Sequence, residues 1–146
     1  ATGIQPRVSE KGLFYIVVNV EGKAIGLRSI EFVDGASSVS SSDISKARVV
    51  KVEGSESASF NPEDLEGVGA WVKDHPGTSK LVIHGTKSNT TVKISDKLRL
   101  QIVACYDYSC ALQAQRLASI KREKFERMLA TARDQLANLP APEPEK

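Results

Sequence analysis

Hydrophobic and polar residues alternate along much of the chain in a way that predicts β-strands. Runs of β-branched and aromatic residues with alternating polarity are typical of strands. Six such segments occur, at residues 13–20, 24–33, 48–53, 80–84, 91–95 and 98–105. Glu21-Gly22-Lys23 has the composition of a tight turn, so residues 13–33 are predicted to form a β-hairpin. The small-residue stretch 36–42 has no periodicity and is predicted to be a loop.

Two other segments carry the helical spacing of apolar residues. Asn61 and Pro62 are typical of a helix N-cap and first position, and apolar residues follow on one face until His75-Pro76-Gly77. A second helix is predicted from Ser109 to about Asn138. Its apolar stripe comprises Phe125, Met128, Leu129, Ala132 and Leu136. A homodimer could form through Phe125, Met128, Leu129 and Leu136 of this helix.

The order of these elements, β-β-β-α-β-β-β-α, predicts an α+β fold. Because the chain shows no internal repeat and no βαβ signature, we expect an antiparallel sheet of about five to six strands with two helices on one face. Residues 1–11 are polar and are expected to be disordered. Residues 12–138 are expected to form a single domain, and residues 139–146 a Pro-rich tail that cannot continue the helix.

Composition and charge argue against several classes of protein. The 146 residues are 40% apolar and 26% charged, as in soluble globular proteins. Twenty basic and eighteen acidic residues give a net charge of +2, without the basic surplus typical of nucleic-acid-binding proteins. No window approaches eighteen apolar residues, so no transmembrane segment is predicted.

The sequence carries no assembled catalytic, metal or cofactor motif. His75 and His84 do not pair with a cysteine at metal-ligand spacing. A Gly-x-Ser-x-Gly nucleophile motif is absent, and the glycines do not have the spacing of a phosphate- or dinucleotide-binding loop. We therefore expect no metal and no cofactor, and a non-catalytic protein rather than an enzyme.

The segment Cys105-Tyr106-Asp107-Tyr108-Ser109-Cys110 holds both cysteines and joins the last predicted strand to the last predicted helix. A turn over four residues can bring two cysteines within disulfide distance, so a Cys105–Cys110 disulfide is predicted. Such a bond would place the protein in the periplasm or outside the cell. A chain that does not begin with Met is consistent with a removed signal peptide. Two buried free thiols are the alternative interpretation.

The same segment could also be a binding surface. Tyr106 and Tyr108 would offer amphipathic contact area on either side of Asp107. A Cys-x4-Cys loop after a strand resembles the inhibitory loop of periplasmic inhibitors of vertebrate lysozymes. In that family the loop carries a histidine and a strand follows it, whereas here a helix is predicted to follow.

Residues 12–40 resemble the opening of retropepsin-type aspartic proteases. The resemblance rests on Gly12-x-Phe14, Glu21-Gly22-Lys23 and Val33-Asp34-Gly35-Ala36-Ser37. It implies that Asp34 would be the catalytic aspartate, paired with its equivalent across a dimer. The family has a Thr or Ser between the aspartate and the glycine, and this residue is missing here.

Residues 58–85 resemble the first helix and strand of outer-membrane-protein-A-like peptidoglycan-binding domains. The matching residues are Leu65, Val68, Trp71, Val72, Pro76 and Leu81-Val-Ile-His-Gly85. Leu112-Gln-Ala-Gln-Arg116 is similar to the family's second-helix motif, which implies that Arg116 would hold the peptide carboxylate of peptidoglycan. The Thr-Asp that follows the strand glycine in the family is replaced by Thr86-Lys87.

Together these patterns favour a non-catalytic envelope domain, periplasmic or secreted, that binds a protein or peptidoglycan partner. The candidate binding residues are Tyr106, Asp107, Tyr108 and Arg116, and the candidate surfaces include the sheet edge and the basic face of the last helix. Three alternatives remain open: a retropepsin-like protease centred on Asp34, a peptidoglycan binder, and an intracellular adaptor whose 112–136 helix pairs with a partner helix.

Overall fold

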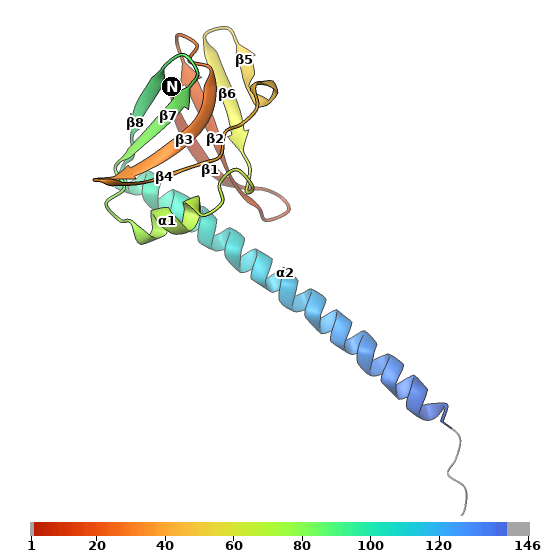
Figure 1. The fold of residues 1–146 in the computed structure, drawn as a ribbon. Coiled ribbons are helices and arrows are strands. Elements are labelled where there is room, and N and C mark those ends of the chain that lie inside the picture. The colour runs from red at the N-terminus through yellow and green to blue at the C-terminus, as the bar shows by residue number, and fades with distance from the viewer. Residues whose placement is uncertain (1, 140–146) are drawn as a thin grey trace, which may run out of the picture. The chain divides into compact units, whose positions relative to one another are not determined.

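The computed structural model describes residues 2–139, which divide into two compact units, residues 2–110 and residues 111–139. The first unit contains eight strands, the short helix α1, a 3-10 turn and the start of helix α2; the second contains the rest of α2 (Figure 1). The elements are β1 (Gly3–Val8), β2 (Phe14–Glu21), β3 (Leu27–Asp34), β4 (Ser37–Ser40), η1 (Lys46–Arg48), β5 (Val50–Val52), β6 (Ser55–Phe60), α1 (Val68–Asp74), β7 (Lys80–Gly85), β8 (Asn89–Lys93) and α2 (Asp96–Ala137).

The strands form two antiparallel sheets of four strands each. One sheet has the order β1-β2-β6-β5 and the other the order β4-β3-β7-β8. The predicted α+β class with an antiparallel arrangement and two helices is therefore confirmed for the described residues. The predicted single sheet and strand order differ from the structure, which has more strands and divides them between two sheets.

Strict alternation in the central strands builds the core. Phe14, Ile16, Val18 and Val20 of β2 are buried, and the residues between them are partly exposed. Buried residues of both sheets and of α1 join one hydrophobic cluster, which also includes Ile102 of α2. Each fully buried side chain of this size stabilises the fold by about 1.5–3 kcal/mol relative to an exposed position. The cluster therefore holds the two sheets together.

The predicted hairpin over residues 13–33 is wrong, although its two strands exist. β2 pairs with β1 and β6, whereas β3 pairs with β4 and β7. The chain leaves one sheet for the other through Gly26, which has a φ of 73°. The buried carboxylate of Glu56 accepts the N–H groups of Ile25, Gly26 and Leu27. These donors bind a side chain here instead of a neighbouring strand.

The predicted strand over residues 98–105 is also wrong, because these residues belong to α2. Ser95 precedes the helix, and its Oγ accepts the Leu98 N–H at 3.1 Å, the geometry of an N-cap. Asp96 adds a carboxylate to the first turn, where the helix dipole favours negative charge. The apolar residues that follow Ser95 and Asp96 have a composition typical of a strand, so the start of this helix was not predicted.

Three strands form where none was predicted. β1 lies in the segment expected to be disordered, and its Pro6 is tolerated because β1 is an edge strand. β4 lies within the predicted 36–42 loop, and the serine-rich β6 directly follows β5. All three depend on pairing with strands that have stronger patterns.

The first helix begins later than predicted. Asn61 does not cap it but closes a tight turn, in which the Asn61 carbonyl accepts the N–H groups of Asp64 and Leu65. The Asp64 carboxylate in turn accepts the Asn61 N–H at 2.9 Å. Gly67, with a φ of 77°, then separates this turn from α1.

Candidate functional site

The predicted disulfide is absent, because both cysteines lie in α2 as free thiols. Five residues of α-helix separate two Cα atoms by about 8.7 Å, which exceeds the range of about 4.4–6.8 Å found in disulfides. The corner that would have brought Cys105 and Cys110 together does not exist. Burial raises the pKa of the Cys105 thiol, which makes this group less reactive.

The helix separates the predicted Tyr106-Asp107-Tyr108 surface into two parts. The Tyr106 ring packs edge-on against Phe14, with ring centroids 6.0 Å apart, and a Cβ at Gly69 of α1 would overlap with it. The Asp107 carboxylate lies 2.8 Å from the Lys73 ammonium group. Tyr108 is 59% exposed and does not share this packing. Tyr106 is thus a packing residue, and only Tyr108 is available as an exposed aromatic contact.

Ser109, the predicted start of the second helix, instead lies inside α2 and anchors it. Its buried Oγ accepts the Phe14 N–H at 3.1 Å and donates to the Gly12 carbonyl at 2.7 Å. The hydroxyl therefore satisfies two backbone groups, one in the connection between β1 and β2 and one at the start of β2. Only the tertiary structure brings these groups next to the helix.

Asp34 ends β3 at a tight connection to β4. Asp34 is the register partner of Ser37, so Gly35 and Ala36 form a two-residue turn, and Gly35 has the positive φ of 58° that such a turn requires. The Asp34 carboxylate lies against Gly77, just after α1. This hairpin accounts for the residues that resemble a retropepsin, and the catalytic role of Asp34 stays an untested prediction.

The residues that resemble a peptidoglycan-binding domain are divided between the two units. Leu81–Gly85 lie in β7, which is antiparallel to both of its neighbours, whereas Arg116 belongs to the part of α2 in the second unit. The role of Arg116 as a carboxylate ligand is likewise untested.

Both histidines have local partners. The His75 ring stacks on Trp71 with centroids 3.9 Å apart, and its Nδ1 lies 2.7 Å from the Trp71 carbonyl oxygen. His84 Nε2 lies 2.9 Å from the Glu31 carboxylate, and this hydrogen bond lowers the pKa of Glu31. Within residues 2–139, no group of three or more potential metal ligands comes together.

The second unit presents an exposed apolar face on α2. At 100° per residue, one strip of the helix surface holds alanines and large apolar residues over more than six turns, with Lys121 between Ala118 and Phe125. We name this surface the α2 stripe; it comprises Ala114, Leu117, Ala118, Phe125, Met128, Leu129, Ala132 and Leu136. Phe125, Met128 and Leu136 are 60–70% exposed. The described part of the second unit has no element that covers this face.

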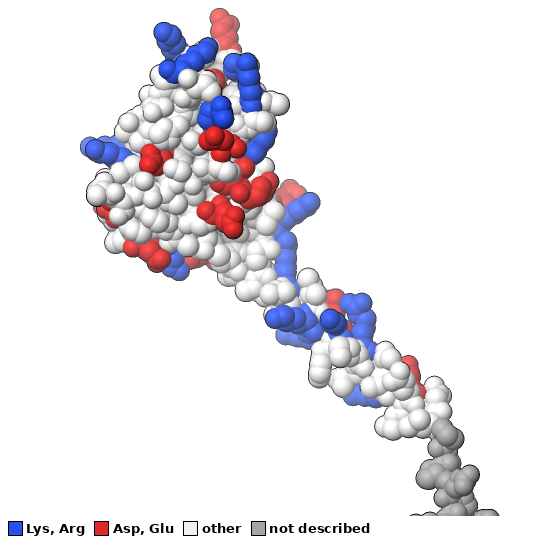
Figure 2. All heavy atoms as spheres, in the orientation of Figure 1, with Lys and Arg blue, Asp and Glu red and all other residues white. Residues whose placement is uncertain are grey.

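Basic residues flank the α2 stripe on both sides. The helical angles place Lys124 along one edge and Arg122 and Arg133 along the other, whereas Lys121 lies within the stripe, between the angles of Met128 and Ala132. Figure 2 shows basic side chains beside uncharged ones along this helix. The charged pair Arg127 and Glu123, 3.9 Å apart, lies on the opposite side from the stripe. The sequence predicted the part of this surface from Phe125 to Leu136, because these residues follow helical spacing, but it did not predict Leu117.

A basic pocket in the first unit was missed by the sequence-based search. It has a volume of about 470 Å³ and is lined by residues from the β2–β3 connection, the start of β3, the η1 region, β5, β6 and the β7–β8 turn. Its charged residues are spread from position 28 to position 87 and share no motif. No local signal could have brought them together.

In comparisons with known proteins, no family model, no curated protein and no solved structure matches the chain. Neither helix, as far as the structure describes them, is both long and apolar enough to cross a membrane.

Proposed function

We propose that the protein is a non-catalytic binding domain that holds a protein partner through the α2 stripe. The observation that carries this proposal is the solvent exposure of Leu117, Phe125, Met128, Leu129 and Leu136 on one face of a single helix. Contiguous exposed apolar surface with a polar rim is typical of interaction sites. Helices in proteins gain most of their stability from packing of an apolar face, so a partner would stabilise this part of α2.

The chemistry of the stripe favours an amphipathic helix with acidic edges as its partner. The alanines at positions 114, 118 and 132 leave room for a second helix to approach closely, whereas Phe125, Met128 and Leu129 supply larger apolar contacts. A second copy of α2 would place basic edges against basic edges, which costs free energy. Glutamate and aspartate edges on the partner would instead pair with Lys124 on one side and with Arg122 and Arg133 on the other.

The length of the stripe is sufficient for a specific complex. The 23 residues from Ala114 to Leu136 span about 34 Å of helix. A partner helix of the same length could bury five large side chains of the stripe, each contributing about 1.5–3 kcal/mol before the costs of association. When a helix binds in a groove or pairs with another helix, its apolar contact residues have the spacing i, i+3, i+4 and i+7. Phe125, Met128, Leu129 and Ala132 of the stripe have this spacing.

Binding of a designed acidic helix tests this proposal. The probe is a fluorescein-labelled 28-residue peptide with Leu at the core heptad positions and Glu at the flanking positions. We expect the full chain to bind it with micromolar affinity by fluorescence anisotropy, and the double variant Phe125→Ser/Leu129→Ser to bind at least tenfold more weakly. Ile120→Ser is the matched control, because Ile120 is 59% exposed but lies off the stripe. Added salt should weaken binding, since the edges are charged.

Four results would overturn the proposal. The first is no binding of the acidic peptide, and the second is an equal loss in Ile120→Ser. The third is sedimentation equilibrium showing a homodimer that Phe125→Ser/Leu129→Ser dissociates, which would identify a second copy as the partner. Cosedimentation with anionic vesicles, abolished by the same double variant, would likewise replace a protein partner with a membrane surface.

The envelope location and the cell-wall partner predicted from the sequence stay predictions. Their main support was the Cys105–Cys110 bond, and α2 holds these thiols apart. The helix-pairing alternative, in contrast, rests on exposed residues that the structure displays.

A further inference from the structure

We infer that the basic pocket of the first unit binds a small anion that carries a phosphate group. The pocket is lined by Gly26, Leu27, Arg28, Ile44, Ser45, Lys46, Val49, Lys51, Glu56, Thr86 and Lys87. Its volume of about 470 Å³ falls within the range of about 300–1,000 Å³ typical of small-molecule sites. The inference is independent of the α2 stripe, with which the pocket shares no residue.

The backbone around the pocket is held in place by hydrogen bonds between two connections. The Thr86 N–H donates to the Gly26 carbonyl, and the Lys87 N–H donates to the Ile25 carbonyl, both at 2.9 Å. A side chain at Gly26 would overlap with the Thr86 hydroxyl, and Gly26 also has a positive φ, so only glycine fits. The β7–β8 turn and the β2–β3 connection therefore form a preorganised wall.

Positive charge exceeds negative charge in the lining. Four basic residues and one acidic residue line the pocket. The acidic residue, Glu56, is 2% exposed, and its two carboxylate oxygens already accept three backbone N–H groups. Burial is the largest single influence and by itself would raise the pKa of Glu56, but the three hydrogen bonds and the nearby Lys51 charge together lower it. The Glu56 carboxylate thus stabilises the backbone of residues 25–27. Most of the positive charge of the lysines remains available to a ligand.

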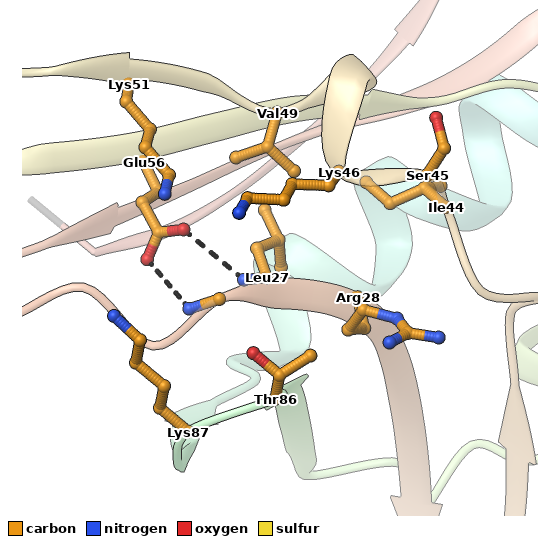
Figure 3. A pocket seen from close by; sticks show the side chains of 11 residues that line it. Leu27, Arg28, Ile44, Ser45, Lys46, Val49, Lys51, Glu56, Thr86 and Lys87 are labelled. Atoms are coloured by element: carbon orange, nitrogen blue, oxygen red, sulfur yellow. Dashed lines mark hydrogen bonds between the residues drawn. The ribbon is translucent and has the colours of Figure 1, made fainter.

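Three lysines remain to receive a ligand. Figure 3 shows the side chains of Lys46, Lys51 and Lys87 extending from different elements toward the space beside Glu56. Arg28 points away from this space, and its guanidinium pairs with Asp43 at 3.3 Å. Among the described residues, no carboxylate forms an ion pair with Lys46 or Lys87. The Lys51 ammonium is close enough to Glu56 to help lower its pKa, after burial and the backbone bonds.

The chemistry of these groups favours phosphate over carboxylate. Lysine ammonium groups are mobile point charges that suit a dianion with several acceptor oxygens, whereas the planar guanidinium that matches a carboxylate is paired with Asp43. The hydroxyls of Ser45 and Thr86 add further donors, and Leu27, Ile44 and Val49 supply an apolar side for the body of the ligand. A phosphate monoester or diphosphate is therefore the expected class.

Titration of the full chain with pyrophosphate tests the inference. By isothermal titration calorimetry at low salt, we expect one saturable site, with at least tenfold weaker binding in Lys46→Met/Lys87→Met. Lys80→Met/Lys93→Met is the matched control: it removes the same charge from an exposed cross-strand pair on β7 and β8. The thermal midpoint of each variant verifies that it is folded. In amide NMR spectra, the largest shifts should occur at Gly26, Thr86 and Lys87.

The inference is overturned by any of four results. Pyrophosphate does not saturate a site, the control variant loses as much affinity as the pocket variant, citrate binds as tightly as pyrophosphate, or the amide shifts lie outside the pocket. Loss of acidic-peptide binding in α2 variants has no bearing on these outcomes, so the two proposals fail separately.

Discussion

At the scale of single residues, buried polar groups decide where the chain crosses between the sheets. Glu56 is the clearest case, because one carboxylate serves three consecutive amides at Ile25, Gly26 and Leu27. A glutamate within a serine-rich strand gives no sign of this role in the sequence. Its importance arises from desolvation, since an unpaired buried N–H costs about 1–3 kcal/mol.

Replacing Glu56 with Gln should destabilise the first unit by about 2 kcal/mol, because an amide NH2 would face backbone donors where an acceptor is needed. Urea unfolding at neutral pH measures the change in free energy. Glu53→Gln, at an exposed position two residues before β6, is the control and should have almost no effect. Equal stability of the two variants would show that the backbone amides find other acceptors.

At the scale of secondary-structure elements, α2 replaces the predicted strand, corner and disulfide with one continuous helix of 42 residues. The residues from Leu98 onward are apolar enough to suit either a strand or a helix. Ser95 and Asp96 favour a helix start at this point, and the burial of Ile102 and the long-range hydrogen bonds of Ser109 then decide the helical state. The predicted helix beyond Ser109 was correct because its stripe keeps a regular helical spacing over several turns.

We expect two free thiols per chain in the native protein under non-reducing conditions, because the helix keeps Cys105 and Cys110 too far apart to bond. Titration with Ellman's reagent should also resolve two rates. The exposed Cys110 should react faster than Cys105, whose thiol pKa is raised by burial. The variants Cys105→Ser and Cys110→Ser assign the two phases. A native protein without reactive thiols would contradict the helical arrangement.

At the scale of the whole molecule, ionised carboxylates connect segments that are distant in the sequence. Arg48 Nη2 lies 2.6 Å from the Asp64 carboxylate and 2.8 Å from the Ser59 carbonyl oxygen, so one guanidinium joins η1, β6 and the turn before α1. The hydrogen bond from Arg48 is the largest cause of the lowered pKa of Asp64. Glu31, beside His84, also has a lowered pKa.

These pKa shifts predict a loss of stability in acid. A carboxyl whose pKa is lower in the folded state contributes stability that is complete above its ordinary pKa, 3.8 for Asp and 4.5 for Glu, and lost as the pH falls through the folded-state value. Asp64→Asn should therefore cost about 2 kcal/mol at pH 7 and progressively less below pH 4.

Thermal unfolding from pH 7 down to pH 2.5 measures this dependence. Asp43→Asn is the matched control, because the Asp43 side chain is 63% exposed in its pair with Arg28 and should contribute little. A destabilisation by Asp64→Asn that is the same at every pH would mean that charge at Asp64 does not support the fold.

The sequence by itself determined the local features of this protein: strands β2, β3, β7 and β8, the α+β class, and the apolar stripe of the last helix. Each of these depends on neighbours within a few residues, so periodicity reveals it. Only the tertiary structure decided the pairing of β2 with β6 and of β3 with β7, the helical state of residues 96–110 and the basic pocket. These features depend on contacts between residues roughly 30 to 95 positions apart, where hydrogen bonds to buried groups outweigh local preference.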